Sequence, residues 1–198
     1  MPLIVVSDSD NERLAREFGY LTYWHENFPF GKKKNDGVRH SLKYDFDYLM
    51  ELNSDGLITN RLMDMYIEQM ESGAEAFGTR NVHFIDSKSK ETRFFQYAGS
   101  QIIGSGRCYS RATVETIVKK GGFWHDRLNK GLDNDSQRAL KIHKVKTVQV
   151  DPGKEPGIID VKSDVNIWPF ETFACRTVAL EEVTAHLSKE ETCYLKNI

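Results

Sequence analysis

The sequence has few cysteines, no long apolar run and no excess of basic residues. Its three cysteines are odd in number and lack the spacing of a metal site, so we expect a reduced chain in the cytoplasm. No stretch approaches the roughly 18 apolar residues of a membrane helix. The opening "MPLIVVSDSD" also lacks the basic region and long apolar region of a signal peptide.

Charge and composition narrow the class of protein further. The formal net charge is −2, which argues against nucleic acid as the bulk partner, because neutralising phosphates needs a basic surface. Apolar residues make up 39% and charged residues 28% of the 198 residues, a balance typical of a soluble globular domain. We therefore expect one domain of ordinary size with a real core.

Short apolar runs alternate with helix-like segments in the first half of the chain. The first such helix carries a capping-box pattern at Ser9 and Glu12, Leu14 and Phe18 on one face, and Gly19 at its end. Alternation of this kind predicts an α/β fold with a parallel sheet. The strands expected are 3–6, 21–24, 48–52 and 145–150, and the helices expected are 9–19, 34–43, 59–71, 111–120, 133–141 and 181–194. Residues 82–85 and 92–97, separated by "DSKSK", predict a hairpin added to that sheet, and the chain after "DPGKEPG" reads as irregular.

Three polar clusters follow or lie near predicted strands. In open α/β sheets, ligands bind beyond the carboxyl ends of the strands, so each cluster is a candidate binding site. The clusters are Ser7-Asp8, Asn53-Ser54-Asp55 and the loop before Asp133.

Asp55 illustrates the two interpretations of such a cluster. A carboxylate fixed just past a buried strand suits a hard divalent cation, which takes oxygen ligands and substrate phosphates. Asp, Asn and Ser are also the usual residues of a turn, and both interpretations stay open. His143 is similarly either a further metal ligand or a structural histidine.

Lysines and glycines mark two further segments. Gly31 and the lysines at 32–34 precede a predicted helix whose first N–H groups could attract phosphate, although most lysine runs are simply solvated. "GGFW" at 121–124 offers Phe123 and Trp124 either as a sugar-stacking platform or as core residues. Asp133 and Asp135 lie at a predicted helix start, where the helix dipole favours acids in any case.

The order of these motifs resembles the nucleotide-sugar glycosyltransferases of the GT-A fold, in particular the large inverting family 2. Gly31 to Asn35 matches a Gly-x-x-x-Asn helix start, and Asn53-Ser54-Asp55 matches an Asp-x-Asp-type triplet. "GGF" and "LDNDSQRAL" then match the Gly-Gly-Phe turn and the acidic pair of the acceptor half, with Arg138 one place early. The resemblance covers about residues 3 to 150.

The resemblance implies a fold and a division of the chain. The fold is a Rossmann-like, mostly parallel sheet flanked by helices, with a small β-rich insert and an irregular or helical C-terminal tail. Residues 1–150 would form the glycosyltransferase domain, with 1–58 as the nucleotide-sugar half and 59–150 as the acceptor half. Residues 151–198 would form an extension packed on the same domain.

The resemblance also implies an activity and its residues. The enzyme would move a sugar from a nucleotide-diphosphate donor, a UDP-sugar above all, to a saccharide or other hydroxyl acceptor, with inversion and with Mn²⁺ or Mg²⁺. Asp133 would be the catalytic base, and Asp55 and His143 would hold the metal. The donor would contact Ser7, Asp8, Lys32, Lys34, Asn35, Asn53 and Ser54, and the acceptor side would comprise Gly122, Phe123, Trp124 and Asp135.

Two departures from the family pattern support a rival interpretation. Asn53 replaces the first acid of the triplet, and "LIVVSDSDNERLA" looks like the second strand-helix unit of the fold, so the opening strand is expected to be absent. Either the chain is a fragment or truncated product, or the nucleotide base is held differently, or catalysis is lost. A catalytically inactive GT-A-like domain that binds carbohydrate or protein is therefore the alternative function. A nucleotidyltransferase ranks third, because no Gly-rich basic loop follows the first strand.

Overall fold

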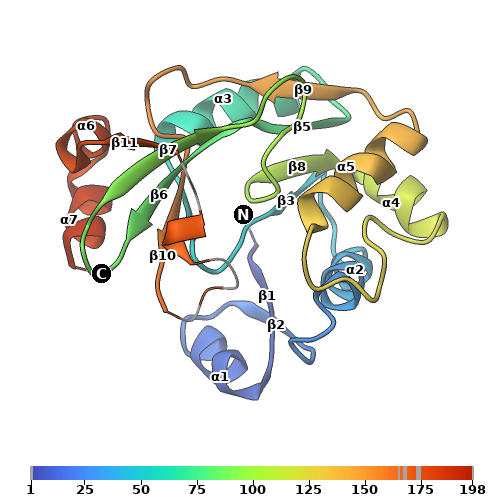
Figure 1. Cartoon of the computed structure of the whole chain (residues 1–198). Helices are drawn as coiled ribbons and strands as arrows, with labels where there is room; N and C mark the ends of the chain where they lie inside the picture. The colour runs from blue at the N-terminus through green and yellow to red at the C-terminus, as the bar shows by residue number, and fades with distance from the viewer. Residues whose placement is uncertain (1, 165, 167–168, 173–174, 198) are drawn as a thin grey trace. The chain divides into compact units, whose positions relative to one another are not determined.

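The computed structural model describes residues 2–164, 166, 169–172 and 175–197. Strands and helices are mixed along the chain, as Figure 1 shows. The strands are β1 Ile4–Ser7, β2 Leu21–Trp24, β3 Tyr48–Glu51, β4 Gly56–Ile58, β5 Ala76–Thr79, β6 Asn81–Asp86, β7 Thr92–Gln96, β8 Arg107–Ser110, β9 Thr147–Val150, β10 Ile158–Lys162 and β11 Arg176–Val178. The helices are α1 Ser9–Glu17, α2 Phe30–Ser41, α3 Asn60–Glu71, α4 Arg111–Lys119, α5 Leu132–Ile142, α6 Leu180–Thr184 and α7 Lys189–Asn197, with a short 3₁₀ turn η1 at Phe170–Thr172. The α/β class predicted from the sequence is confirmed.

The chain divides into two compact units. Unit 1 comprises residues 1–49 and 109–146, and unit 2 comprises residues 50–108 and 147–198. The chain passes from one unit to the other three times: within β3, within β8 and directly before β9. The prediction of a domain at 1–150 with an extension at 151–198 stays a prediction.

The sheets combine parallel and antiparallel pairs. β1 pairs with β2 in parallel, and β5 pairs with β9 in parallel within a four-stranded sheet of order β3-β8-β5-β9. The five-stranded sheet, of order β11-β7-β6-β10-β4, contains one parallel pair, β6 with β10. Its other pairs are antiparallel, and they include the predicted hairpin of β6 and β7. The sheets are therefore mixed overall.

Several helices start and end at residues that stabilise their terminal turns. In α3, the N-cap Thr59 accepts a hydrogen bond from the Leu62 N–H at 3.4 Å, and in α4 the N-cap Ser110 accepts one from the Thr113 N–H at 3.3 Å. Gly19 and Gly73 follow α1 and α3 with φ values of 73° and 75°, a conformation that glycine adopts without steric cost. The stop at Gly19 was predicted from the sequence.

Helix α1 differs from its prediction at the cap. Asp8 occupies the N-cap and Ser9 is the first helical residue, so the expected cap at Ser9 is wrong by one position. Leu14 and Phe18, expected to share a face, are exposed, and Ala15 is the buried apolar residue.

The core of unit 2 is built on α3 and the strands that follow it. Tyr66 and Phe77 are fully buried and meet edge to face with 5.1 Å between ring centroids. The Tyr66 hydroxyl accepts a hydrogen bond from the Thr79 N–H at 3.1 Å, and burial raises the pKa of Tyr66. A second cluster lies under the C-terminal helices and comprises Ile85, Ile159, Val178, Val183 and Leu195.

Two expectations for the C-terminal quarter are wrong. The segment after "DPGKEPG" is not irregular, because Ile158–Lys162 forms β10 between β6 and β4. The single helix expected at 181–194 is two helices, α6 and α7. A capping box starts the second: the Ser188 hydroxyl accepts from the Glu191 N–H at 3.1 Å, and the Glu191 carboxylate accepts from the Ser188 N–H at 2.7 Å.

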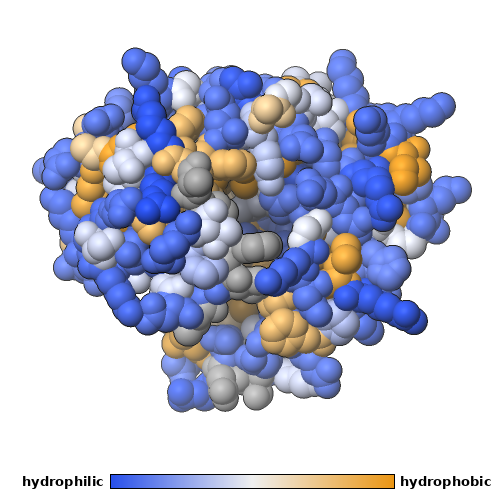
Figure 2. All heavy atoms as spheres, viewed as in Figure 1, coloured by the Kyte–Doolittle hydropathy of each residue, from blue (hydrophilic) through white to orange (hydrophobic). Residues whose placement is uncertain are grey.

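No helix in the described part of the chain combines the length and the apolar character needed to cross a membrane. Hydrophobic residues nevertheless reach the surface, in orange on the face that Figure 2 shows. Most of the large exposed ones lie near the N-terminus and comprise Leu3, Leu14, Phe18, Tyr20, Leu21, Trp24 and Phe28.

Candidate functional site

The two motifs that carried most of the resemblance meet in unit 1 at the side chain of Asn35. This residue lies in α2 and is 1% exposed. Its amide NH₂ donates to the Trp124 carbonyl at 2.6 Å and to the Asp126 carboxylate at 2.8 Å. Its amide oxygen accepts from the N–H groups of Phe123 and Trp124 at 3.0 and 3.3 Å. We call this set of four hydrogen bonds the Asn35 clamp.

The clamp explains two of the motif glycines. Gly122 has φ 110°, and a Cβ at this position would lie 2.4 Å from the Asn35 amide oxygen. A Cβ at Gly31 would lie 2.2 Å from the carbonyl oxygen of His125. Both glycines therefore permit the close approach of α2 to the loop at 121–129.

Asn35 itself does not have an amide group left for a nucleotide. An asparagine side chain offers two donor hydrogens and one acceptor oxygen, and the clamp uses all of them. Its expected role in donor binding is corrected to a structural one. The sequence could not distinguish the two roles, because the clamp partners lie about ninety positions away.

The N–H groups at the start of α2, which were predicted to bind phosphate, also have protein partners. The helix begins at Phe30, so the three lysines lie inside its first turns and do not precede it. The Phe30 N–H donates to the Asn129 side chain at 3.1 Å, and the Gly31 and Lys32 N–H groups donate to the carbonyls of Leu128 and Asp126 at 2.8 and 3.2 Å. The loop at 126–129 thus satisfies the helix N–H groups that a phosphate would need.

Lysine side chains remain as possible phosphate contacts. The Lys32 ammonium binds Asp36, and this hydrogen bond raises the pKa of Lys32. The Lys33 ammonium donates to the Asn27 side chain at 2.8 Å. The Lys34 ammonium lies 5.3 Å from the ring centroid of Trp124, a cation–π contact. Lys32 and Lys34 stay predictions as donor contacts.

Phe123 and Trp124 are core residues. They are 1% and 4% exposed, and the Phe123 ring packs between Trp124 and Tyr109 at centroid distances of 5.5 and 4.4 Å. Rings this deeply buried cannot form a platform for a sugar, which corrects that interpretation. The Trp124 indole N–H donates to the Leu132 carbonyl at 3.1 Å, so Trp124 joins Lys34 to the start of α5.

The two acids at the start of α5 differ in their surroundings. Asp135 accepts from the His125 N–H and forms an ion pair with Arg138, both at 2.5 Å, so this acceptor-side residue anchors its own helix. Asp133 is half-buried in the first turn, where the helix dipole stabilises a carboxylate. Its role as the catalytic base stays a prediction.

Ser7 and Asp8 end β1 in unit 1, and their side chains already have partners. The Ser7 hydroxyl donates to the Asp8 carbonyl at 3.2 Å. The Asp8 carboxylate accepts from the side chains of Asn11 and Asn27 at 3.2 and 2.6 Å. Their contact with a donor stays a prediction.

Asn53, Ser54 and Asp55 form a turn between β3 and β4 in unit 2. The Gly56 N–H donates to the Asn53 carbonyl at 3.0 Å, which closes the turn. Asn53 and Ser54 are exposed. The backbone of this triplet therefore forms a turn, as one of the two interpretations expected.

The side chain of Asp55 does not fit a divalent metal. Its carboxylate accepts from the Asn166 side chain and lies 3.6 Å from the Lys162 ammonium. Lys162 is buried and also pairs with Asp160 at 2.7 Å. A cation at Asp55 would lie next to an existing positive charge, which repels it.

His143 lies at the far end of α5. It is the C-cap of that helix, about 15 Å along the axis from Asp133. His143 belongs to unit 1 and Asp55 belongs to unit 2. The residues predicted to bind the donor are divided in the same way: Asn53 and Ser54 belong to unit 2, and the others belong to unit 1. Among the described residues, no group of three or more His, Cys, Asp or Glu side chains is arranged to hold a metal ion.

Comparison with known proteins identifies no family for this chain. No family model matches it, and no curated protein matches it. One solved structure with some likeness is that of mannose-1-phosphate geranyltransferase from Thermus thermophilus, at 14% identity and a TM-score of 0.29. The match covers 80% of this chain and 58% of that one, so the chain spans less than two thirds of that protein's length. A likeness at this level carries no argument about function.

Sequence reasoning missed a groove in unit 1 between the end of β2 and the first turns of α2. Its volume is about 330 Å³. It is lined by Tyr23, Trp24, His25, Glu26, Phe28, Pro29, Lys32 and Asp36. The signal for it in the sequence is the aromatic-rich run "YWHENFPF" at 23–30, which covers the end of β2 and the connection to α2.

A hydrogen-bonded ion network lies at one side of this groove. The Asp36 carboxylate pairs with Lys32, with His25 at 3.0 Å and with Arg39 at 2.6 Å. Burial raises the pKa of Asp36, but the hydrogen bonds from Lys32, His25 and Arg39 outweigh it and lower the pKa to about 2. Asp36 therefore stays ionised throughout the ordinary pH range.

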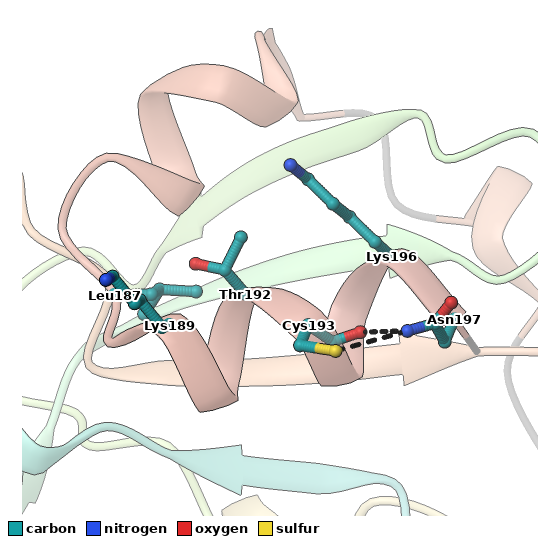
Figure 3. A pocket seen from close by; sticks show the side chains of 6 residues that line it. All are labelled: Leu187, Lys189, Thr192, Cys193, Lys196 and Asn197. Atoms are coloured by element: carbon teal, nitrogen blue, oxygen red, sulfur yellow. Dashed lines mark hydrogen bonds between the residues drawn. The ribbon is translucent and has the colours of Figure 1, made fainter.

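A second shallow hollow lies on α7 in unit 2 (Figure 3). It is lined by Leu187, Lys189, Thr192, Cys193, Lys196 and Asn197. The Asn197 amide donates to the Cys193 carbonyl at 2.8 Å and to its sulfur at 3.3 Å. None of the residues predicted from the sequence lies in this hollow.

Proposed function

We propose that this chain is a glycosyltransferase with a GT-A-type architecture that moves a sugar from a nucleotide-diphosphate donor to an acceptor hydroxyl with inversion. The donor is a UDP-sugar and the acceptor is a saccharide or another hydroxyl compound. Asp133 serves as the base, and Lys32 and Lys34 serve as the nearby cations. The proposal rests on the order of motifs in the sequence and on their arrangement in unit 1.

One observation supports the proposal more than any other. Trp124 contacts the Lys34 ammonium with its ring and donates its indole N–H to Leu132, the residue before Asp133. A single buried side chain thus connects the lysine-bearing helix to the acid at the start of α5. The Asn35 clamp holds the same helix to residues 123–126, the loop that carries Trp124.

The proposed chemistry follows from these positions. The oxygen of the acceptor hydroxyl attacks the anomeric carbon, the bond from that carbon to the diphosphate oxygen breaks, and the proton passes to the Asp133 carboxylate. A carboxylate is a weak base, so correct placement of Asp133 contributes as much as basicity does. Lysine ammonium groups favour the negative charge that develops on the leaving diphosphate.

Divalent metal is implied by the resemblance alone. Asp55 would be its ligand, but the paired Lys162 does not suit a cation there, so no step of the proposed reaction passes through a metal. Whether turnover needs Mn²⁺ or Mg²⁺ is a separate prediction. Adding and chelating each ion during the turnover assay tests it.

The test is to compare turnover and binding in one substitution. Wild-type protein is incubated with a panel of UDP-hexoses and neutral saccharide acceptors, and the released UDP is measured. Asp133→Asn should abolish release of UDP but leave calorimetric binding of the UDP-hexose nearly unchanged. Asn134→Ala, at the exposed neighbouring position, is the control and should retain both. Equal loss of turnover and donor binding in Asp133→Asn would contradict the assignment of the base.

A second candidate function is a GT-A-like domain that binds carbohydrate or protein without catalysis. The ion pair of Asp55 with Lys162 favours it, because that pair occupies the position expected of a metal ligand. The discriminating measurement is the heat of UDP binding with and without Mn²⁺. An inactive domain should show no heat that depends on the metal.

A further inference from the structure

The groove between β2 and α2 has aromatic walls that remain open to solvent. Trp24 is 52% exposed and Phe28 is 60% exposed, although large aromatic side chains are usually well covered. Within the described part of the chain, the Trp24 indole makes no hydrogen bond and no ring contact. Its ring face is therefore available to a ligand.

The other rings of the groove are fixed by their neighbours. Phe28 packs edge to face on Phe30 with centroids 4.7 Å apart, and Tyr23 stacks on His40 at 4.2 Å. Their contacts limit the motion of both side chains before any ligand arrives. A site formed in advance loses less conformational entropy when it binds.

The charged groups of the groove balance one another. Among the lining residues Glu26 and Asp36 are acidic and Lys32 is basic, and Asp36 is also paired with Arg39, which lies outside the lining. A phosphate or another anion would find no net positive charge here, and a cation would find no net negative charge. A neutral ligand suits this balance.

The pattern of polar groups indicates which neutral ligand. The Lys32 ammonium is a donor and is about half exposed, and the Glu26 carboxylate is an acceptor on the exposed rim. Hydroxyl groups can satisfy both, because each one donates and accepts. A pyranose combines a rim of hydroxyls with an apolar face of C–H groups that can lie on a ring such as Trp24.

We propose that this groove binds a neutral saccharide, with one pyranose ring lying on Trp24 beside Phe28 and with its hydroxyls bonded to Lys32 and Glu26. This binding does not depend on sugar transfer, and it uses none of the residues assigned to the reaction except Lys32. It holds equally for an enzyme and for an inactive domain.

The experiment uses saturation-transfer NMR on the full chain. The probes are a panel of neutral methyl pyranosides and their disaccharides, with uridine and inorganic phosphate as comparison probes. Wild-type protein should transfer magnetisation to the C–H protons of at least one sugar. Trp24→Ala and Phe28→Ala should each weaken that binding on the order of tenfold, the loss expected when one apolar sugar face is no longer covered.

Phe18→Ala provides the matched control. Phe18 is also an exposed phenylalanine, at 68%, but it lies at the end of α1 and does not line the groove. It should leave saccharide binding unchanged, and the fold of all three variants is checked by circular dichroism. Because Trp24 and Phe28 are mostly exposed, their removal should not unfold the chain.

Several results would overturn the proposal. They are the absence of binding by every sugar in the panel, equal weakening by Phe18→Ala, and unchanged binding in Trp24→Ala. Binding of uridine alone through Trp24 would replace the sugar by a nucleobase and would also contradict it. So would self-association of the chain that Trp24→Ala abolishes while no saccharide binds. Asp133→Asn should bind the sugar normally, so failure of the reaction and failure of the groove can be told apart.

Discussion

Two adjacent glycines allow the Asn35 clamp to be tested with a matched pair of substitutions. Gly121 and Gly122 have similar backbone angles, with φ of 116° and 110°. A Cβ at Gly121 would meet no atom within 4 Å, whereas one at Gly122 would meet the Asn35 amide oxygen at 2.4 Å. Alanine at either position adds similar backbone strain, but only Gly122→Ala also displaces Asn35.

The expected magnitudes follow from these contacts. Backbone strain should lower the free energy of unfolding by about 1–3 kcal/mol in both variants. Gly122→Ala should lower it by roughly 2–4 kcal/mol more, because four buried hydrogen bonds, each contributing about 1 kcal/mol net, are disturbed. Urea denaturation followed by circular dichroism measures both values.

A double-mutant cycle then isolates the cause. In an Asn35→Ala background, the amide that the new methyl group would meet is absent, so the extra effect of Gly122→Ala should disappear. Equal destabilisation by Gly121→Ala and Gly122→Ala would refute the reasoning. So would an extra effect of Gly122→Ala that persists undiminished without Asn35.

Three further predictions concern ionisable groups. The pKa of Asp36 is lowered to about 2, so its pairing should contribute about 2 kcal/mol to the free energy of unfolding above pH 4. This contribution is lost as the pH falls toward 2, and Asp36→Asn should flatten this part of the curve of unfolding free energy against pH. Burial, aided by Arg176, lowers the pKa of His83 to about 4, so the unfolded chain binds a proton first and stability should decrease as the pH falls from 6.5 to 4; His83→Gln should remove that slope in the same titration. Lys162→Met leaves the buried carboxylate of Asp160 without its ion pair and should lower the unfolding free energy by about 3 kcal/mol in urea, and an unchanged value would show that this pair is not stabilising.

The sequence predicted most helices because their end signals are local. Thr59, Ser110, Gly19 and Gly73 each act within one turn of the helix they start or end. The break between α6 and α7 had an equally local signal, the Ser188 and Glu191 capping box, which was overlooked.

Several strands were harder to predict because their patterns are weak. β4 and β11 have only three residues each, which is too short for a clear alternation of apolar and polar residues. The sequences of β5, "AFGT", and β8, "RCYS", contain glycine, arginine and cysteine, which are not typical of a strand. β10 was missed for a different reason: it follows a segment rich in Pro and Gly, which reads as a loop. Its place between β6 and β4 depends on pairing with residues far away in the chain.

The residue types of the candidate site were easier to predict than their roles. The resemblance assigns Asn35, Gly122 and Trp124 to the ligand site, but their burial and partners are set by segments about ninety residues apart. The groove at Trp24 could not be predicted, because an aromatic residue at the end of a strand looks like any other core residue in the sequence. Exposure decides the difference, and only the folded chain supplies it.

The Asn35 clamp has a consequence for how substitutions in this region are interpreted. Each of the residues Asn35, Gly31 and Gly122 fixes the distance between α2 and residues 121–129. A loss of activity on substituting one of them would therefore indicate that this loop has separated from α2, and would not show a direct role in the reaction. Selection for a folded protein alone would keep these three positions unchanged, even in descendants that no longer process any substrate. The presence of the same three residues in a related protein would therefore indicate a shared structure and would not show that it catalyses a reaction.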